Sequence, residues 1–90
     1  MNYIFLDNGF EEIEAITTID LLRRANIALT TISVTGQAMV TGAHDIIVKA
    51  DALFADADFS DAEMLILPGG ATKLHERKPL CDLLLKHNAE

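Results

Sequence analysis

A strand, a helix and a second strand follow one another in residues 2–35, and this order restricts the chain to folds that contain a parallel sheet. Residues 2–7 are mostly apolar and end at Asn8-Gly9, which predicts a buried strand. Isoleucine and leucine recur at helical spacing in residues 11–25, with acids in the first turn and arginines in the last, which predicts an amphipathic helix. Residues 27–35 alternate and are rich in β-branched side chains, as is typical of a strand. Two strands joined by a helix over this length form a βαβ unit with parallel strands.

The next part of the chain predicts a hairpin and a third parallel strand. Met39-Val40 and Ile46-Ile47-Val48 flank a polar turn and favour a hairpin or flap. The acidic segment 51–61 favours a loop or a single helical turn. Residues 62–67 predict a buried strand that stops at Pro68-Gly69-Gly70, because proline cannot donate to a strand pair and glycine permits positive φ.

The C-terminal residues predict a final helix that begins near Lys78-Pro79, since proline suits a first helical turn.

Three parallel strands would leave a sheet edge that we expect to be long, flat and apolar. Parallel sheets are usually covered on both faces and continue further. We therefore expect residues 1–90 to be an incomplete domain: a fragment, a cleaved chain or a chain that needs a partner.

Composition excludes several classes of function. Ninety residues form at most one small domain, and half of them are apolar, which is enough for a packed core. Seven basic residues against fourteen acidic ones give a net charge of −7, which disfavours binding to nucleic acid or to an anionic membrane surface. No apolar run approaches the about 18 residues of a membrane span, and the first residues do not resemble a signal peptide.

Cysteine and histidine usage argues against disulfides and metals. One cysteine, Cys81, rules out an internal disulfide and fits a reducing, cytoplasmic setting. The three histidines show no ligand spacing with Cys81 or with one another, so we expect no metal site. Gly69-Gly70-Ala71 lacks the further glycine of a dinucleotide fingerprint, and no Walker-type lysine follows, so no cofactor is indicated.

Three glutamates and a glycine turn are the candidates for chemistry. Glu11, Glu12 and Glu14 follow the first strand, and ligands of open α/β sheets collect beyond the carboxyl ends of the strands. From the residues alone, such a carboxylate either stabilises a helix N-terminus or works as an acid or base. The turn at Gly69-Gly70 is either a tight connection or a source of backbone N–H donors for a developing negative charge.

A family resemblance narrows these alternatives. Three stretches carry it: Gly9-Phe10-Glu11-Glu12-Ile13-Glu14-Ala15, Asp20-Leu21-Leu22-Arg23-Arg24-Ala25 and Leu65-Ile66-Leu67-Pro68-Gly69-Gly70. In this order and separation they resemble the DJ-1/ThiJ/PfpI superfamily, of the Parkinsonism-associated deglycase type. The resemblance implies a flavodoxin-like α/β sandwich, similar to class I glutamine amidotransferases. Residues 1–90 would be the N-terminal half of that single domain, without its nucleophile elbow.

The resemblance also implies which residues carry the chemistry. The family uses a cysteine nucleophile that would lie beyond Glu90, and Cys81 does not match it; we interpret Cys81 as a small buried hydrophobe. Glu14 matches the glutamate that hydrogen-bonds this cysteine and moves protons. Gly69, Gly70 and Ala71 would be the oxyanion-stabilising backbone donors, while Glu11 and Glu12 would only stabilise the helix N-terminus.

By resemblance, the complete protein would be a cytoplasmic, cofactor-free homodimer with glyoxalase III or deglycase activity on reactive dicarbonyls or their adducts, and a stress-response or chaperone role. Residues 1–90 alone would have no turnover. The alternatives are a PfpI-like peptidase and a non-catalytic flavodoxin-like binding module. Some relatives carry an arginine in the flap where this chain has His44, which we interpret as a solvated turn histidine.

Overall fold

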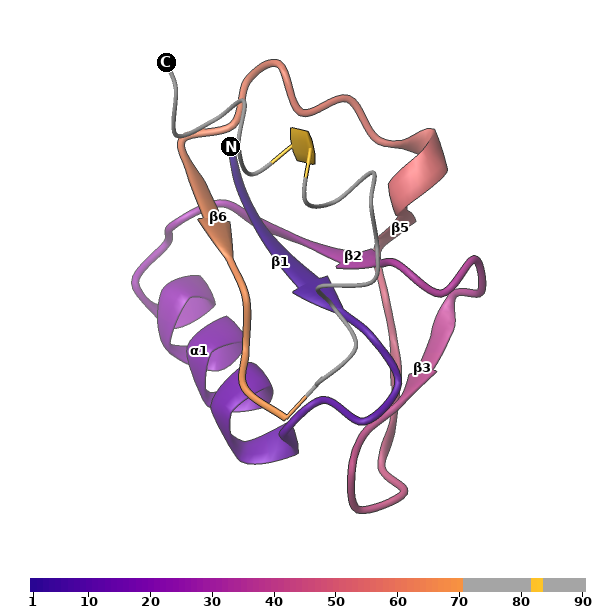
Figure 1. The fold of residues 1–90 in the computed structure, drawn as a ribbon. Coiled ribbons are helices and arrows are strands. Elements are labelled where there is room, and N and C mark those ends of the chain that lie inside the picture. The colour runs from indigo at the N-terminus through magenta and orange to yellow at the C-terminus, as the bar shows by residue number, and fades with distance from the viewer. Residues whose placement is uncertain (71–81, 84–90) are drawn as a thin grey trace.

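The fold is that of a computed structural model, which describes residues 1–70 and 82–83 of the chain. Residues 1–70 form a four-stranded sheet, a separate two-stranded sheet, one helix and one 3-10 turn (Figure 1). The elements are, in chain order, β1 (Asn2–Leu6), α1 (Glu12–Arg24), β2 (Leu29–Ser33), β3 (Met39–Thr41), β4 (Ile47–Lys49), β5 (Ala52–Leu53), η1 (Phe54–Asp56) and β6 (Met64–Ile66).

The larger sheet has the order β5-β2-β1-β6, and all its pairs are parallel. β1 lies in the middle, where Asn2 is in register with Leu29 of β2 and with Met64 of β6. Every residue of β1 is buried, as expected of a parallel strand that is covered on both faces. The predicted βαβ unit is therefore confirmed, and the architecture is the flavodoxin-like α/β class.

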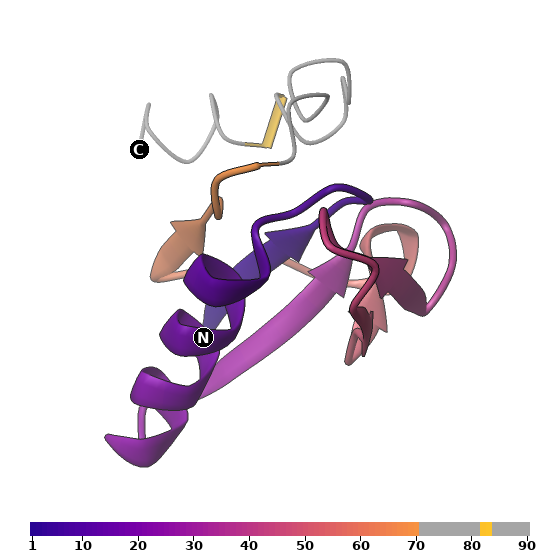
Figure 2. The same ribbon diagram turned by 90° about the horizontal axis from the view of Figure 1, so that it is seen from below.

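Alternate residues of β1 point into two separate apolar cores, one on each face of the sheet. Ile4 and Leu6 face α1 and the β3–β4 hairpin, which contribute Ala15, Val40 and other side chains. Figure 2 shows α1 lying across this face. Tyr3 and Phe5 face the opposite side, where they pack with Ile32 and with aromatic side chains of the segment that leads to β6: Phe54 and Phe59.

Helix α1 begins and ends where local signals predict. Glu11 is its N-cap and accepts a hydrogen bond from the Ile13 backbone N–H at 2.8 Å, and Asn26 follows its C-terminus in the left-handed region at φ 62°. The buried stripe consists of Glu12 and Ala15, with Ile19 and Leu22 packed against the core. The first isoleucine of the predicted apolar series, Ile13, is instead 76% exposed, because the sheet contacts the face centred on Ala15.

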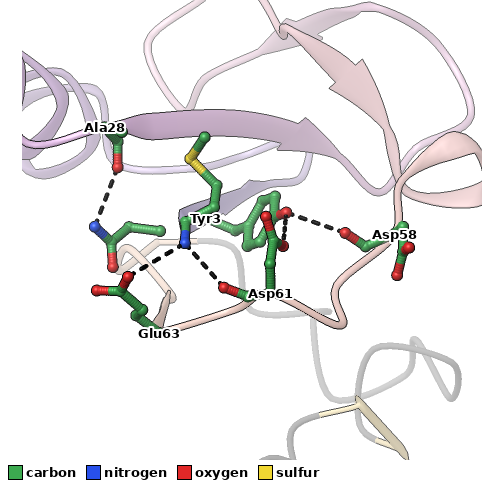
Figure 3. A network of polar contacts seen from close by, with 7 residues as sticks. Tyr3, Ala28, Asp58, Asp61 and Glu63 are labelled. Carbon is green, nitrogen blue, oxygen red and sulfur yellow. Dashed lines mark hydrogen bonds and ion pairs between the residues drawn. The ribbon is translucent and has the colours of Figure 1, made fainter.

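A polar network fixes the start of β1 against the segment that precedes β6 (Figure 3). The Tyr3 hydroxyl donates to Asp61 Oδ1 at 2.6 Å and also contacts the Asp58 carbonyl oxygen at 3.0 Å. The Met1 ammonium group donates to the Asp61 carbonyl oxygen at 2.9 Å and lies 3.6 Å from a carboxylate oxygen of Glu63. The hydrogen bond to Asp61, together with burial, raises the pKa of Tyr3 to about 12.

Two predictions about the sheet need correction. The segment 51–61 does contain a single helical turn, η1, followed by a loop, but it also contains a strand that was not predicted: Ala52–Leu53 forms β5 and pairs with Ile32 and Ser33 before η1 begins. The edges of the sheet are short, since β5 and β6 have two and three residues and Pro68 follows soon after β6. Of the predicted final helix from Lys78, the structure describes Asp82 and Leu83, which are helical. The rest of that helix and the buried interpretation of Cys81 lie outside the described residues.

Candidate functional site

The start of α1 and the segment after β6 meet beyond the carboxyl ends of β1 and β6. The Glu11 backbone N–H donates to the Gly69 carbonyl oxygen at 2.8 Å, which joins the two segments directly. Because β1 and β6 are neighbouring parallel strands, the residues that follow them emerge at the same edge of the sheet. This is the place where ligands bind in open α/β folds.

Glu14 and Gly69 contact one another at this edge. Glu14 lies in the first turn of α1 and its side chain is exposed to solvent. A methyl group added at Gly69 would overlap Glu14 Oε2 and would lie 3.2 Å from its Cδ atom. The absence of a side chain at Gly69 therefore makes room for the carboxylate. Two of the predicted site residues are brought together by the fold.

Gly70 is restricted by its backbone. Its φ of +90° lies in the region that glycine adopts without strain. A Cβ atom at this position would lie 2.6 Å from the Glu11 backbone nitrogen and 2.9 Å from the Gly9 carbonyl oxygen. The Gly69-Gly70 turn is thus a tight connection that lies directly against the Gly9–Glu11 backbone. The third predicted backbone donor, Ala71, lies outside the described residues.

Glu12 has a role that sequence reasoning missed. Its side chain is 4% exposed, and its carboxylate bonds to the β3–β4 turn: Oε2 accepts the His44 backbone N–H at 2.6 Å, and Oε1 lies 2.8 Å from His44 Nδ1. The Ile46 N–H lies 3.5 Å from Oε2. The prediction that Glu12 only stabilises the helix N-terminus is therefore wrong, whereas Glu11 does cap the helix through Ile13.

The Glu12–His44 pair has strong electrostatic consequences. Burial raises the pKa of Glu12, but the hydrogen bonds from His44 and Ile46 outweigh it and bring the pKa to about 2. The same hydrogen bond to Glu12, and the negative charge of that carboxylate, raise the pKa of His44. His44 is exposed, as a turn histidine should be, but its ring is bound to α1 and does not simply face water.

The two glutamates and the histidine also form the kind of group that binds metals. One donor atom from each of Glu11, Glu12 and His44 lies within 4.8 Å of the others, a cluster that histidine spacing along the chain did not indicate. Both oxygens of Glu12 already accept hydrogen bonds from the hairpin, and Glu11 Oε1 accepts one from Ile13. These contacts assign Glu12 and His44 to the attachment of the hairpin, and Glu11 to the cap of α1.

Within residues 1–70 and 82–83, no helix has the length and the apolar character that crossing a bilayer requires.

Comparison with known proteins identifies the family of the chain. The family model described as "DJ-1/PfpI family" matches residues 2–89. Among curated proteins, protein DJ-1 homolog B of Arabidopsis thaliana is 35% identical over 86 residues, which are 92% of this chain and 20% of that protein. The Parkinson disease protein 7 homolog of Danio rerio is 31% identical over 68 residues, which are 74% of this chain and 36% of that protein.

Solved structures agree with this assignment. Oxidized DJ-1 of Toxoplasma gondii superposes with a TM-score of 0.91 at 28% identity, over 98% of this chain and 50% of that one. A DJ-1 superfamily protein of Salmonella typhimurium, solved as a cysteine-to-alanine mutant, gives a TM-score of 0.88 at 32% identity over 98% and 49% of the two chains. The chain thus spans about half the length of these structures. On its sequence and its fold, the chain belongs to the DJ-1/PfpI family.

Proposed function

We propose that residues 1–90 form the N-terminal half of a single DJ-1/PfpI domain, and that the other half, in the same or a separate chain, supplies a cysteine nucleophile. The complete protein would act without a cofactor on reactive dicarbonyls or their adducts, as a glyoxalase or deglycase. The matched length supports this proposal, since the chain aligns with about half of the Toxoplasma structure. The cysteine that was mutated in the Salmonella relative supports a cysteine as the reactive group.

The contact between Glu14 and Gly69 is the observation that carries the proposal. It puts a solvent-accessible carboxylate next to a backbone turn at the carboxyl edge of a parallel sheet. A carboxylate at this position can accept and return protons, and a glycine turn can supply N–H donors to an oxyanion. An acid–base group and an oxyanion site are what thiol-based chemistry on a carbonyl needs.

The proposed reaction on methylglyoxal balances without an oxidant. The thiolate adds to the aldehyde carbon, and the electron pair of the C=O bond moves to oxygen, which the Gly69-Gly70-Ala71 turn stabilises. Glu14 removes the proton from this carbon, the C–H electron pair forms a C=C bond, and the electron pair of the neighbouring C=O bond moves to its oxygen. Glu14 then returns the proton to that neighbouring carbon, the first oxygen re-forms its C=O bond to give a thioester, and the second oxygen takes a proton from water. Water then cleaves the thioester to release lactate and the thiolate.

The proposal includes a homodimer in the cytoplasm, with a role under carbonyl or oxidative stress. Three large apolar side chains exposed on α1 and on the hairpin are available for a protein–protein contact: Ile13, Leu21 and Ile47.

The test is methylglyoxal consumption by the completed protein, combined with the intact mass of the purified material. We expect Glu14→Gln to lower kcat by about 10²–10⁴, the usual contribution of a general acid–base group. Glu11→Gln is the matched control, because this neighbouring acid contacts the backbone of its own helix, and it should leave kcat within about twofold. A completed, folded protein that is inert, or one whose activity is unaffected by Glu14→Gln, would instead favour the non-catalytic binding module.

A further inference from the structure

The turn between β1 and α1 is held from two sides. On one side it bonds to the β3–β4 hairpin: the Gly9 N–H donates to the Thr41 carbonyl oxygen at 2.8 Å, and the Ala43 N–H donates to the Phe10 carbonyl oxygen at 2.9 Å. On the other side, the Glu11 N–H donates to the Gly69 carbonyl oxygen at 2.8 Å. The position of Gly69, and hence its contact with Glu14, depends on a turn that the hairpin supports.

Glu12 is the side chain that fastens the hairpin to this turn. Its two oxygens accept the His44 N–H and approach the His44 ring, so one carboxylate bonds to both backbone and side chain of the hairpin turn. The site is shaped around it, because a Cβ atom at Gly42 would lie only 2.5 Å from Glu12 Cδ. A buried carboxylate costs free energy unless it is hydrogen-bonded. Moving the hairpin away would therefore leave the buried Glu12 carboxylate without its hydrogen bonds, which disfavours other arrangements of the hairpin.

We propose that Glu12 is a positioning residue: its carboxylate attaches the β3–β4 hairpin to the start of α1 and thereby holds the turn against which the Gly69-Gly70 segment lies. This role of Glu12 is structural. It rests on the proposed function in one respect only: a displaced turn lowers activity only if the Glu14–Gly69 site is catalytic. The connection is a chain of hydrogen bonds. Glu12 bonds to the hairpin, the hairpin bonds to Gly9 and Phe10 of the turn, and Glu11, the next residue of that turn, bonds to Gly69.

His44 makes this attachment dependent on pH. Its ring faces the carboxylate of Glu12, and the charges of Glu11 and Asp45 also act on it; all three are negative when ionised. The protonated imidazole therefore binds the carboxylate as a charged pair, and the neutral ring binds it only through a hydrogen bond. The hairpin should hold the turn more firmly when His44 is protonated.

Hydrogen exchange of backbone amides, followed by NMR on the chain as it exists, tests the proposal. Glu12→Gln should lower the protection factors of the His44 and Ile46 amides by about tenfold or more, and that of the Glu11 amide by about threefold or more. In the native chain, the protection of Glu11 should also fall as pH rises through the titration of His44. That pH step should be absent from His44→Ala, which keeps the Glu12 carboxylate and is the milder variant if Glu12→Gln does not fold.

Asp20→Asn is the matched control, because this exposed acid lies about two turns further along α1, pairs with Arg24 and should leave all these protection factors unchanged. A loss of protection confined to His44 and Ile46, with Glu11 unaffected and without a pH step, would overturn the proposal. The exchange data do not depend on turnover. If Glu14→Gln left the activity of the completed protein unchanged, the proposed chemistry would be refuted, but the positioning role of Glu12 would stand.

Discussion

The carboxylate of Glu14 occupies the space that a side chain at Gly69 would fill, so the first turn of α1 and the end of β6 share one site. Neither residue creates this site alone. Glu14 is carried by the helix that follows β1, and Gly69 by the turn that follows β6, and the parallel pairing of these strands brings the two together.

The two glycines should respond differently to alanine. Gly69→Ala meets only the mobile end of an exposed glutamate and should cost less than about 1 kcal/mol, since that side chain can rotate away. Gly70→Ala meets backbone atoms at 2.6 and 2.9 Å and has a φ of +90°, so it should cost about 2 kcal/mol or more. Urea unfolding of the two variants measures the difference.

The double variant Gly69→Ala, Glu14→Ala provides the control for this pair. Removing the carboxylate should abolish the cost of the methyl group, giving a coupling free energy that the Gly70 variant does not show. Equal costs for the two alanines would contradict the geometry of the turn.

The attachment of the hairpin should be strongest in a defined pH window. The pKa of Glu12 is lowered from 4.5 to about 2, so its contribution is complete above pH 4.5 and is lost as pH falls toward 2. The pKa of His44 is raised from 6.5, so its contribution is complete below pH 6.5 and is lost as pH rises through the higher folded value. Unfolding measured from pH 3 to 9 should show this maximum, and His44→Gln should remove its alkaline limb. An unchanged limb would show that another group causes it.

Tyr3 offers a direct optical test. The chain has one tyrosine, so absorbance near 295 nm during alkaline titration reports Tyr3 alone and should give a midpoint near pH 12. Because the folded pKa is the higher one, stability should fall between pH 10 and about 12, where only the unfolded chain ionises.

Tyr3→Phe should cost about 1–2 kcal/mol, because it removes the hydroxyl that contacts Asp58 and Asp61. It should also remove the alkaline fall in stability. A midpoint near pH 10 in the native chain would show that these contacts do not persist in solution.

Asp51 and Asp20 form a matched pair of ion-pairing acids. Asp51 Oδ2 accepts both the Thr31 backbone N–H at 3.0 Å and an Arg23 nitrogen at 2.8 Å, whereas Asp20 bonds only to Arg24 one helical turn away. Asp51→Ala should cost about 1–2 kcal/mol because it leaves a backbone group of β2 without its acceptor. Asp20→Ala should cost about 0.5 kcal/mol or less, as exposed helical pairs usually do. Thermal unfolding of both variants gives the comparison, and similar costs would argue against the Thr31 contact.

The elements with local signals could be predicted from the sequence. Asn8-Gly9 marks the end of β1, and Asn26 marks the end of α1, since each can adopt the backbone that its position needs. β5 could not be predicted, because Ala52–Leu53 is too short to show periodicity and is a strand only through its pairing with β2.

The site was predictable only in part, because it too depends on contacts between segments that are far apart in the sequence. Glu14 and Gly69 were found through a family pattern, and nothing in the spacing of the chain indicates that they touch. The Glu12–His44 contact depends on how the hairpin packs on α1. The sequence does not indicate which of several polar residues this tertiary packing will bury. A glutamate on the face of α1 that also carries Ala15 is the one local signal that could have indicated a buried, paired carboxylate.

The central place of β1 in the sheet also has a consequence for the order of folding. β1 reaches β2 through one helix, but it reaches β6 only after more than twice as much intervening chain, as the partners of Asn2 show. Doubling a loop adds only about 0.6 kcal/mol to the entropy of closure, but the nearer pairing also forms earlier during synthesis. The βαβ unit can therefore fold first, and β6 then pairs with a β1 strand that is already in place. The Glu14–Gly69 contact would then be among the last features of the chain to form.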